Sequence, residues 1–229
     1  MRVWHWDGFF DYLTNAYLFE GALISLGLTV VALVMGLAGG IVVALLRLSG
    51  GRFGRGFALA YCWFFRGTPL LVQLLMIYTA LPLFGIRLSV IEATLLGLSL
   101  NEAAYLSETV RAGILAVPRG QGEAATALGL HSVQRFRLVV WPQALRIIIP
   151  PLGNSVNGLL KTTSIASVIS MDELLRRTQI LVQEKFLVLE LFTVAALYYL
   201  LMTTVWDMVQ RRLEARFGRG YAGESADRR

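Results

Sequence analysis

The sequence predicts an all-α integral membrane protein with about five transmembrane helices. Charged residues make up 16% of the 229 residues, whereas about 25% is usual in soluble domains. Hydrophobic residues make up 56%, and the mean hydropathy is +0.61. The uncharged run 21–46 is longer than the roughly 20 apolar residues that cross a bilayer as a helix. These observations exclude a disordered chain, and the single cysteine, Cys62, excludes an intrachain disulfide scaffold.

Apolar stretches separated by polar connections define five predicted spans. These spans cover 21–46, 56–84, 90–115, 147–170 and 186–208. An external N-terminal segment (1–20) precedes the transmembrane domain (21–210), and a cytoplasmic polar tail (211–229) follows it. The end of this tail, 218–229, is polar and glycine-rich, and we expect it to be disordered.

Lysine and arginine lie mainly on one side of these spans, which predicts the orientation. The first loop, the long connection 116–146 and the tail hold 13 of them, and the opposite side holds five. Basic residues are enriched in cytoplasmic loops, so we expect an external N-terminus and a cytoplasmic C-terminus. Topology then explains most of the net charge of +6, and no nucleic acid is expected as a partner. The acidic N-terminal segment lacks the basic start of a signal peptide, so the first span is expected to be retained.

Polar residues line one face of the third predicted span. Asn101, Glu108 and Arg111 fall within an arc of roughly 80°, at about 100° per residue of an α-helix. Ionisable groups inside a membrane usually face a bundle interior or a water-filled path. Glu102, a further candidate pathway residue, points about 100° away from Asn101 and is expected to face a different helix.

A second polar stripe lies in the fourth predicted span. Its members also fall within roughly 80° and are Asn154, Asn157, Lys161 and Ser164. Two helices that each carry one polar stripe are what a solute pathway between helices requires. A structural explanation stays open, in which Glu108 and Arg111 neutralise each other and the asparagines link neighbouring helices.

The segment Arg66-Gly67-Thr68-Pro69 interrupts the second predicted span. Pro69 lacks a backbone N–H and clashes with the carbonyl one turn earlier, so it should kink or break the helix. Arg66 then either begins the true span at the cytoplasmic boundary or lies at a broken-helix site.

The connection 116–146 is long for a compact membrane protein and is expected to be structured. Pro118 is suited to opening a helix, and Gly129 to ending one through a left-handed residue. The sequence therefore predicts a short helix on the cytoplasmic face with Glu123 exposed. Such a helix either docks into a groove of another protein or lies at the membrane interface without a partner.

Four motifs in order resemble the permeases of ATP-binding cassette (ABC) importers, in the polar amino acid uptake subfamily of histidine, glutamine, arginine and opine type. One motif is the EAA loop, in which Val139 and Trp141 stand where Ile and Leu are usual. The others lie at 65–73, 141–154 and 160–169, and Thr162 departs from the usual Asp or Asn. Within the EAA loop, the resemblance assigns coupling to an ATPase to Glu123, Ala124, Ala125, Gly129 and Pro142.

The resemblance implies a type I ABC importer permease in the cytoplasmic (inner) membrane of a bacterium, paired with a second copy or a paralogue. It implies that the short loop helix couples to cytoplasmic ATPase subunits, which bind ATP and Mg²⁺. It also implies an extracytoplasmic binding protein that delivers the amino acid.

The residues themselves also indicate that this chain forms the transport path and that a separate subunit hydrolyses ATP. A phosphate-binding loop requires G-x-x-x-x-G-K-[ST], but neither of the two lysines, Lys161 and Lys185, follows a glycine. The two histidines, His5 and His131, lie on opposite sides of the predicted membrane, so no metal cluster or Ser-His-Asp triad is expected. We therefore expect a transport subunit without enzymatic activity and without a bound cofactor.

Two other classes remain open from the residues alone. A stand-alone secondary transporter or channel for small polar solutes would use the same polar stripes, and an assembly subunit would use the charges only to hold partners. Neither class requires the EAA helix. If the chain carries an amino acid, Lys161 is suited to an α-carboxylate, and Glu102 or Glu108 to a cationic group. This weakly favours a cationic or zwitterionic substrate.

Overall fold

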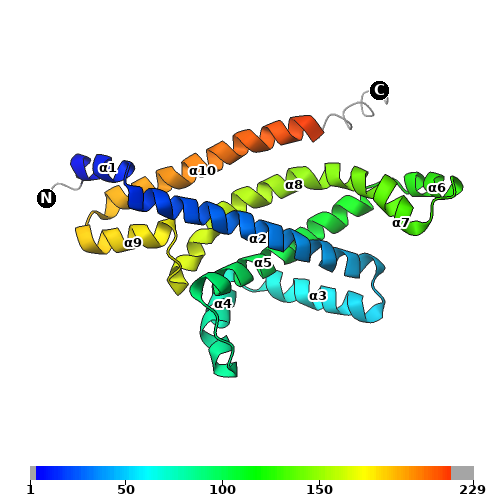
Figure 1. Cartoon of the computed structure of the whole chain (residues 1–229), viewed down its shortest axis with the longest axis horizontal. Helices are drawn as coiled ribbons and strands as arrows, with labels where there is room; N and C mark the ends of the chain where they lie inside the picture. The colour runs from blue at the N-terminus through cyan, green and yellow to red at the C-terminus, as the bar shows by residue number, and fades with distance from the viewer. Residues whose placement is uncertain (1–3, 218–229) are drawn as a thin grey trace.

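A computed structural model of the chain describes residues 4–217 and contains helices and no strand within that range (Figure 1). In chain order the α-helices are α1 (Trp6–Leu13), α2 (Ala16–Ser49), α3 (Arg52–Gly67), α4 (Leu70–Leu75), α5 (Val90–Leu115), α6 (Arg119–Ala127), α7 (Ser132–Arg135), α8 (Trp141–Thr162), α9 (Leu174–Lys185) and α10 (Val188–Phe217). Two π segments are η1 (Met76–Ala80) and η3 (Phe136–Val140), and two 3₁₀ segments are η2 (Leu81–Phe84) and η4 (Thr163–Ile169).

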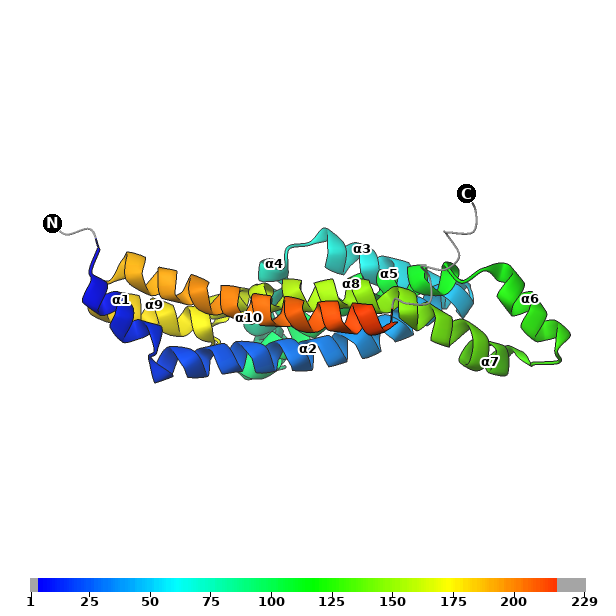
Figure 2. The same cartoon turned by 90° about the horizontal axis from the view of Figure 1, so that it is seen from above.

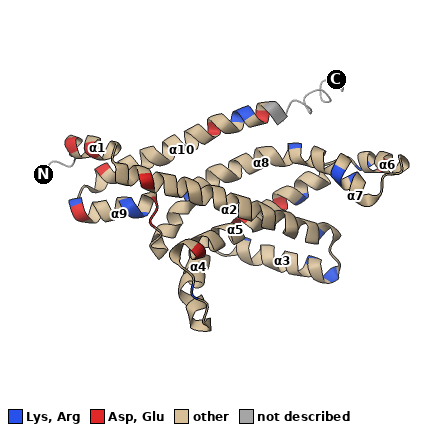
Figure 3. Ribbon diagram, viewed as in Figure 1, with Lys and Arg blue, Asp and Glu red and all other residues tan. Residues whose placement is uncertain are grey.

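The long helices run along one axis of an elongated molecule (Figures 1 and 2). Helices α1 and α9 lie at one end, and α6 and α7 project from the other. We call these the α1–α9 end and the α6–α7 end. The central parts of α2 and α10 carry no charged residues (Figure 3). This distribution is typical of helices that cross a hydrocarbon layer.

Helices α2 and α5 form the most extensive helix pair of the bundle. Small residues allow this close approach, because a Cβ atom at Gly36 would lie 2.9 Å from the Glu102 Cβ. At Gly40 a Cβ atom would lie 3.0 Å from the Leu106 Cβ and 3.1 Å from the Ser107 nitrogen. Glycines spaced four apart are a common contact surface between membrane helices.

The second predicted span is broken. Helix α3 and the segment Leu70–Phe84 meet at an angle of 104°. The break falls at Thr68 and Pro69, both of which have extended backbone conformations. Pro69 cannot donate a hydrogen bond to the preceding turn, which explains why the helix ends there.

The third predicted span coincides with α5, whereas the other boundaries differ. At the start of α5, the Ser89 hydroxyl accepts a hydrogen bond from the Glu92 N–H, and Glu92 in turn accepts one from the Ser89 N–H. Helix α8 begins at Trp141, before the predicted span, and residues 163–169 form 3₁₀ turns. Helix α10 takes in residues 211–217 of the predicted tail, and residues 218–229 lie outside the described residues.

Two helices appear where we expected only connecting segments. Helix α1 lies in the predicted N-terminal segment, and α9 lies between the fourth and fifth predicted spans. The Glu173 side chain caps α9 by accepting a hydrogen bond from the Arg176 N–H at 2.8 Å. Leu18, Leu174 and Leu191 then join α2, α9 and α10 in one apolar cluster at the α1–α9 end.

By length and composition, α2 and the stretch 188–215 of α10 are each suited to crossing a membrane, and the bent pair α3 and 70–84 forms a possible third span. Helices α5 and α8, which carry the polar stripes, are not among them. The number of five spans therefore stays a prediction.

Candidate functional site

Helix α6 is the short helix that the sequence predicted between Pro118 and Gly129. Pro118 is its N-cap, and Gly129 follows its last residues with a φ of 78°. The Gly129 N–H donates to the Thr126 carbonyl (2.9 Å), and the Leu130 N–H donates to the Ala125 carbonyl (3.1 Å). This pair of bonds is the Schellman pattern, in which a left-handed residue ends a helix and turns the chain.

The α6 surface is open on the side away from the bundle. Among the coupling candidates, Glu123, Ala124 and Pro142 are exposed, and Ala125 is buried. A shallow hollow runs along α6 past Glu123 and Thr126 to Arg135. Arg135 holds the returning chain against α6 by donating to the Thr126 hydroxyl at 3.0 Å. The helix is thus presented on a fixed loop at the end of the molecule (Figure 2).

Asn101, in the polar stripe of α5, contacts the helix break. Its side-chain amide donates to the Phe65 carbonyl (3.1 Å) and to Oε1 of Gln73 (3.0 Å). The Gln73 amide in turn donates to the Phe65 carbonyl (2.9 Å) and to the Thr68 carbonyl (3.1 Å) and hydroxyl (2.8 Å). Gln73 is only 3% exposed and was not among our site residues. The sequence feature that could have identified Gln73 is a polar amide within an apolar run, shortly after Pro69.

Glu108 is held by two arginines. Its carboxylate accepts hydrogen bonds from Arg111, one turn along α5, and from Arg47 in the last turn of α2. The i, i+3 pairing considered from the sequence is therefore present, and a second cation joins it. Glu108 is one-third exposed, so this cluster lies at a partly open surface.

Glu102 faces α2 and α8, away from the direction of Asn101, as the helical geometry predicts. Its stem packs at the position of Gly36, and its carboxyl group lies beside the Ser155 hydroxyl of α8. Its buried Oε1 atom has no hydrogen-bond partner among the described residues.

The polar stripe of α8 faces α10. The Asn157 amide donates to Oδ1 of Asp207 at 2.7 Å, so Asp207 is a further polar residue that the sequence reading missed. Lys161 and Ser164 line a hollow with Tyr199 and Thr203 of α10. In this hollow Lys161 is exposed.

The remaining α8 candidate, Asn154, is also exposed. Among the described residues, no hydrogen bond or ion pair connects the α5 stripe with the α8 stripe. Within one chain the two stripes therefore face different neighbours.

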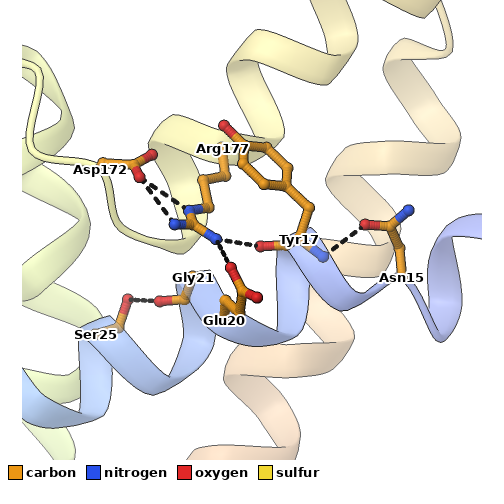
Figure 4. Close-up of polar contacts among 7 residues, drawn as sticks. All are labelled: Asn15, Tyr17, Glu20, Gly21, Ser25, Asp172 and Arg177. Carbon is orange, nitrogen blue, oxygen red and sulfur yellow. Dashed lines mark hydrogen bonds and ion pairs between the residues drawn. The ribbon is translucent and has the colours of Figure 1, made fainter.

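An ionic cluster joins α2 and α9 at the α1–α9 end (Figure 4). Arg177 donates to Asp172 and to Glu20, each at 2.9 Å, and to the Tyr17 carbonyl at 2.8 Å. Its guanidinium also lies 4.4 Å from the centre of the Tyr17 ring. Two carboxylates and an aromatic ring thus surround one nearly buried cation.

Glu173 is wholly buried beside this cluster. Its carboxylate accepts hydrogen bonds from Ser25 of α2 (3.2 Å) and Tyr199 of α10 (2.9 Å). Burial raises the pKa of Glu173 above its ordinary value, and the hydrogen bonds it accepts only partly offset this rise. Glu173 therefore ties the start of α9 to both long helices.

Comparisons with known proteins agree with the motifs. Residues 36–219 match the family described as binding-protein-dependent transport system inner membrane component. The arginine transport system permease protein ArgU of Corynebacterium glutamicum is 36% identical, over 96% of this chain and 74% of its own length. The glutamine transport system permease protein GlnP of Escherichia coli K12 is 38% identical, over 87% of this chain and 92% of its own length.

Solved structures agree with the fold. A chain in the crystal structure of an amino acid ABC transporter with histidines superposes with a TM-score of 0.82 at 36% identity, covering 87% of this chain and 94% of that one. A chain of the MetNI methionine ABC transporter in an inward-facing conformation superposes with a TM-score of 0.69. It is 19% identical and covers 91% of this chain and 97% of its own, so it supports the fold alone.

Proposed function

The chain belongs to the family of binding-protein-dependent transport system inner membrane components, and on this premise we propose that it is the permease subunit of an ATP-driven amino acid importer in a bacterial inner membrane. The observation that carries the proposal is α6, an exposed helix held on a rigid loop at the end of the bundle. Relatives named for arginine and glutamine transport support an amino acid as the substrate.

Coupling to ATP hydrolysis takes place at α6. Glu123 and Ala124 present a small, acidic surface to a cytoplasmic ATPase subunit, which binds ATP and Mg²⁺. Glu123 is the central residue of α6, beyond the first turn in which we expected it, so its carboxylate is available to accept hydrogen bonds from the ATPase subunit and is not committed to the helix N-terminus. A movement of the ATPase then reaches the long helices through the rigid Schellman turn and α8.

The solute path forms between two permease subunits. In each subunit the α5 stripe is occupied by contacts to α2, α3 and α4, whereas Lys161 and Ser164 open into the hollow beside α10. A charged lysine in a membrane helix requires an anionic partner or water. The α-carboxylate of a cationic or zwitterionic amino acid is such a partner, delivered by an external binding protein.

Reconstitution tests the proposal. The chain is placed in proteoliposomes with its ATPase and binding protein, and uptake of labelled arginine and glutamine is measured with and without internal ATP. Glu123→Lys reverses the charge on α6, and Gly129→Val strains a left-handed residue at a cost of about 1 kcal/mol or more. Both variants should lose ATP-driven uptake and ATPase retention, while Glu184→Lys, an exposed charge reversal on α9, should keep both.

Uptake driven by a solute or ion gradient in liposomes that contain this chain alone would support the secondary-transporter alternative instead. Wild-type uptake and ATPase retention in both α6 variants would show that α6 is not the coupling element.

A further inference from the structure

A second basic hollow lies apart from the α8–α10 hollow, between α2, α3 and α5. It has a volume of about 420 Å³. Arg47, from the last turn of α2, and Arg66, from the last turn of α3, line it together with Tyr105 of α5. The break after α3 places Arg66 here, because the chain turns by 104° directly after it.

The charges around this hollow do not balance. Glu108 is the acid that pairs with Arg47, and it also pairs with Arg111. In the part of the chain that the structure describes, Arg66 takes part in no ion pair or hydrogen bond through its guanidinium, which lies 5.4 Å from the centre of the Tyr105 ring. Of the two arginines that line the hollow, Arg47 is therefore paired with an acid that it shares with Arg111, and Arg66 has no paired acid among the described residues.

Arg66 is exposed, and no described residue uses its guanidinium donors, so an anion that binds beside Arg66 and Arg47 gains charge-assisted hydrogen bonds. An arginine presents five N–H donors in a planar fork that fits the oxygens of a phosphate or carboxylate. The hollow is therefore suited to an oxyanion.

The walls beside the arginines are apolar and open. Leu59 and Trp63 of α3 line the hollow, and Trp63 is 79% exposed. Phe57 and Phe64, also on α3, are exposed by 65% and 40%. An oxyanion that carries acyl chains fits a pair of arginines flanked by such a surface, whereas a free amino acid leaves the apolar surface uncovered.

We propose that this hollow binds the phosphate headgroup of an anionic phospholipid such as phosphatidylglycerol. The phosphate lies between Arg47 and Arg66, and the acyl chains lie along α3. Since the lipid contacts α2, α3 and α5 at once, it holds the broken helix α3 against the helix pair α2–α5. The binding does not depend on which solute the permease carries.

Native mass spectrometry of the purified full chain tests this proposal. Phosphatidylglycerol and phosphatidylcholine with identical acyl chains are supplied in equal amounts, and bound lipid is counted. We expect a preference for phosphatidylglycerol of about tenfold, which is the effect of one charge-assisted contact. Arg66→Gln should abolish this preference, and Arg66→Lys, which keeps the charge, should retain most of it.

The matched control is Arg55→Gln, which removes the same charge from an exposed position in the first turns of α3 and should bind lipid like the wild type. Equal binding of both lipids, or equal effects of Arg66→Gln and Arg55→Gln, would overturn the proposal. Glycerol phosphate and glutamine are added as competitors, and neither should displace the lipid. Displacement by glycerol phosphate would show that the acyl chains do not contribute to binding. Displacement by glutamine would show that the hollow belongs to the solute path.

Discussion

Lys161 is the charged residue of the α8–α10 hollow. It is exposed beside Ser164, Tyr199 and Thr203, and among the described residues it forms no ion pair. It lies in the last turn of α8, where the negative end of the helix dipole stabilises a positive charge by about 0.3–1 kcal/mol. An anionic solute group in the hollow would pair with this charge directly.

Lys161→Met keeps the length of the apolar stem but removes the ammonium group. We expect ATP-driven uptake to fall by about tenfold or more, because one charge-assisted contact to the carboxylate is lost. Initial rates in proteoliposomes measure this effect. Lys185→Met, the same change at the other lysine of the chain, should transport normally. Normal uptake by Lys161→Met would remove this residue from the solute path.

At the scale of one element, the broken helix depends on Gln73. Its buried amide supplies donors to the Phe65 carbonyl and to both oxygens of Thr68, at the place where Pro69 supplies none. Gln73→Leu preserves the approximate volume but leaves these oxygens without this donor. We expect a loss of about 1–3 kcal/mol in the free energy of unfolding, which is the cost of a buried unsatisfied polar group.

Unfolding of the detergent-solubilised chain by denaturant measures this loss. Gln183→Leu, the same substitution at an exposed position of α9, should leave the midpoint nearly unchanged. Equal denaturation midpoints for the two variants would mean that other groups or water donate hydrogen bonds to the Phe65 and Thr68 oxygens at the break.

The contact between α2 and α5 depends on the absence of side chains at Gly36 and Gly40. Gly40→Leu places a side chain where even a Cβ atom lies within 3.2 Å of the α5 backbone. Overpacking of this kind costs about 1–3 kcal/mol or more, so we expect a lower Tm of the purified protein. Gly27→Leu, on the same helix with no atom within 4 Å of the added Cβ, is the control and should not lower it. A Tm of Gly40→Leu equal to that of Gly27→Leu would contradict close packing of α2 on α5.

At the scale of the whole molecule, local signals in the sequence predicted the elements that depend on local chemistry. Hydropathy predicted the span 90–115 that became α5, and the backbone preferences of Pro118 and Gly129 predicted α6 between them. The break at Pro69 follows from its missing N–H. In each case the cause lies within a few residues of its effect.

Contacts between distant residues were not predictable in the same way. Glu173 caps α9 and contacts Ser25, which lies 148 positions away, so neither α9 nor this junction followed from local patterns. The second cation on Glu108, Arg47, comes from another helix and was assigned to a loop. The partner of Asn157, Asp207, lies 50 positions further along the chain. A polar stripe shows that a helix has polar contacts, but the fold decides which helix provides them.

The predicted orientation of the molecule rests on the distribution of arginines among its connections. The α6–α7 end and the connection after α2 carry the arginines that predict the cytoplasmic side, and the connection between η2 and α5 lies on the predicted outer side. In a Cys62→Ala background, Ser49→Cys and Arg87→Cys place single thiols at exposed positions on these two sides. An impermeant thiol reagent added to intact cells should label Arg87→Cys, and it should label Ser49→Cys only after permeabilisation. Labelling of both thiols in intact cells would contradict a membrane crossing between residues 49 and 87. The bent pair α3 and 70–84 would then not cross the bilayer.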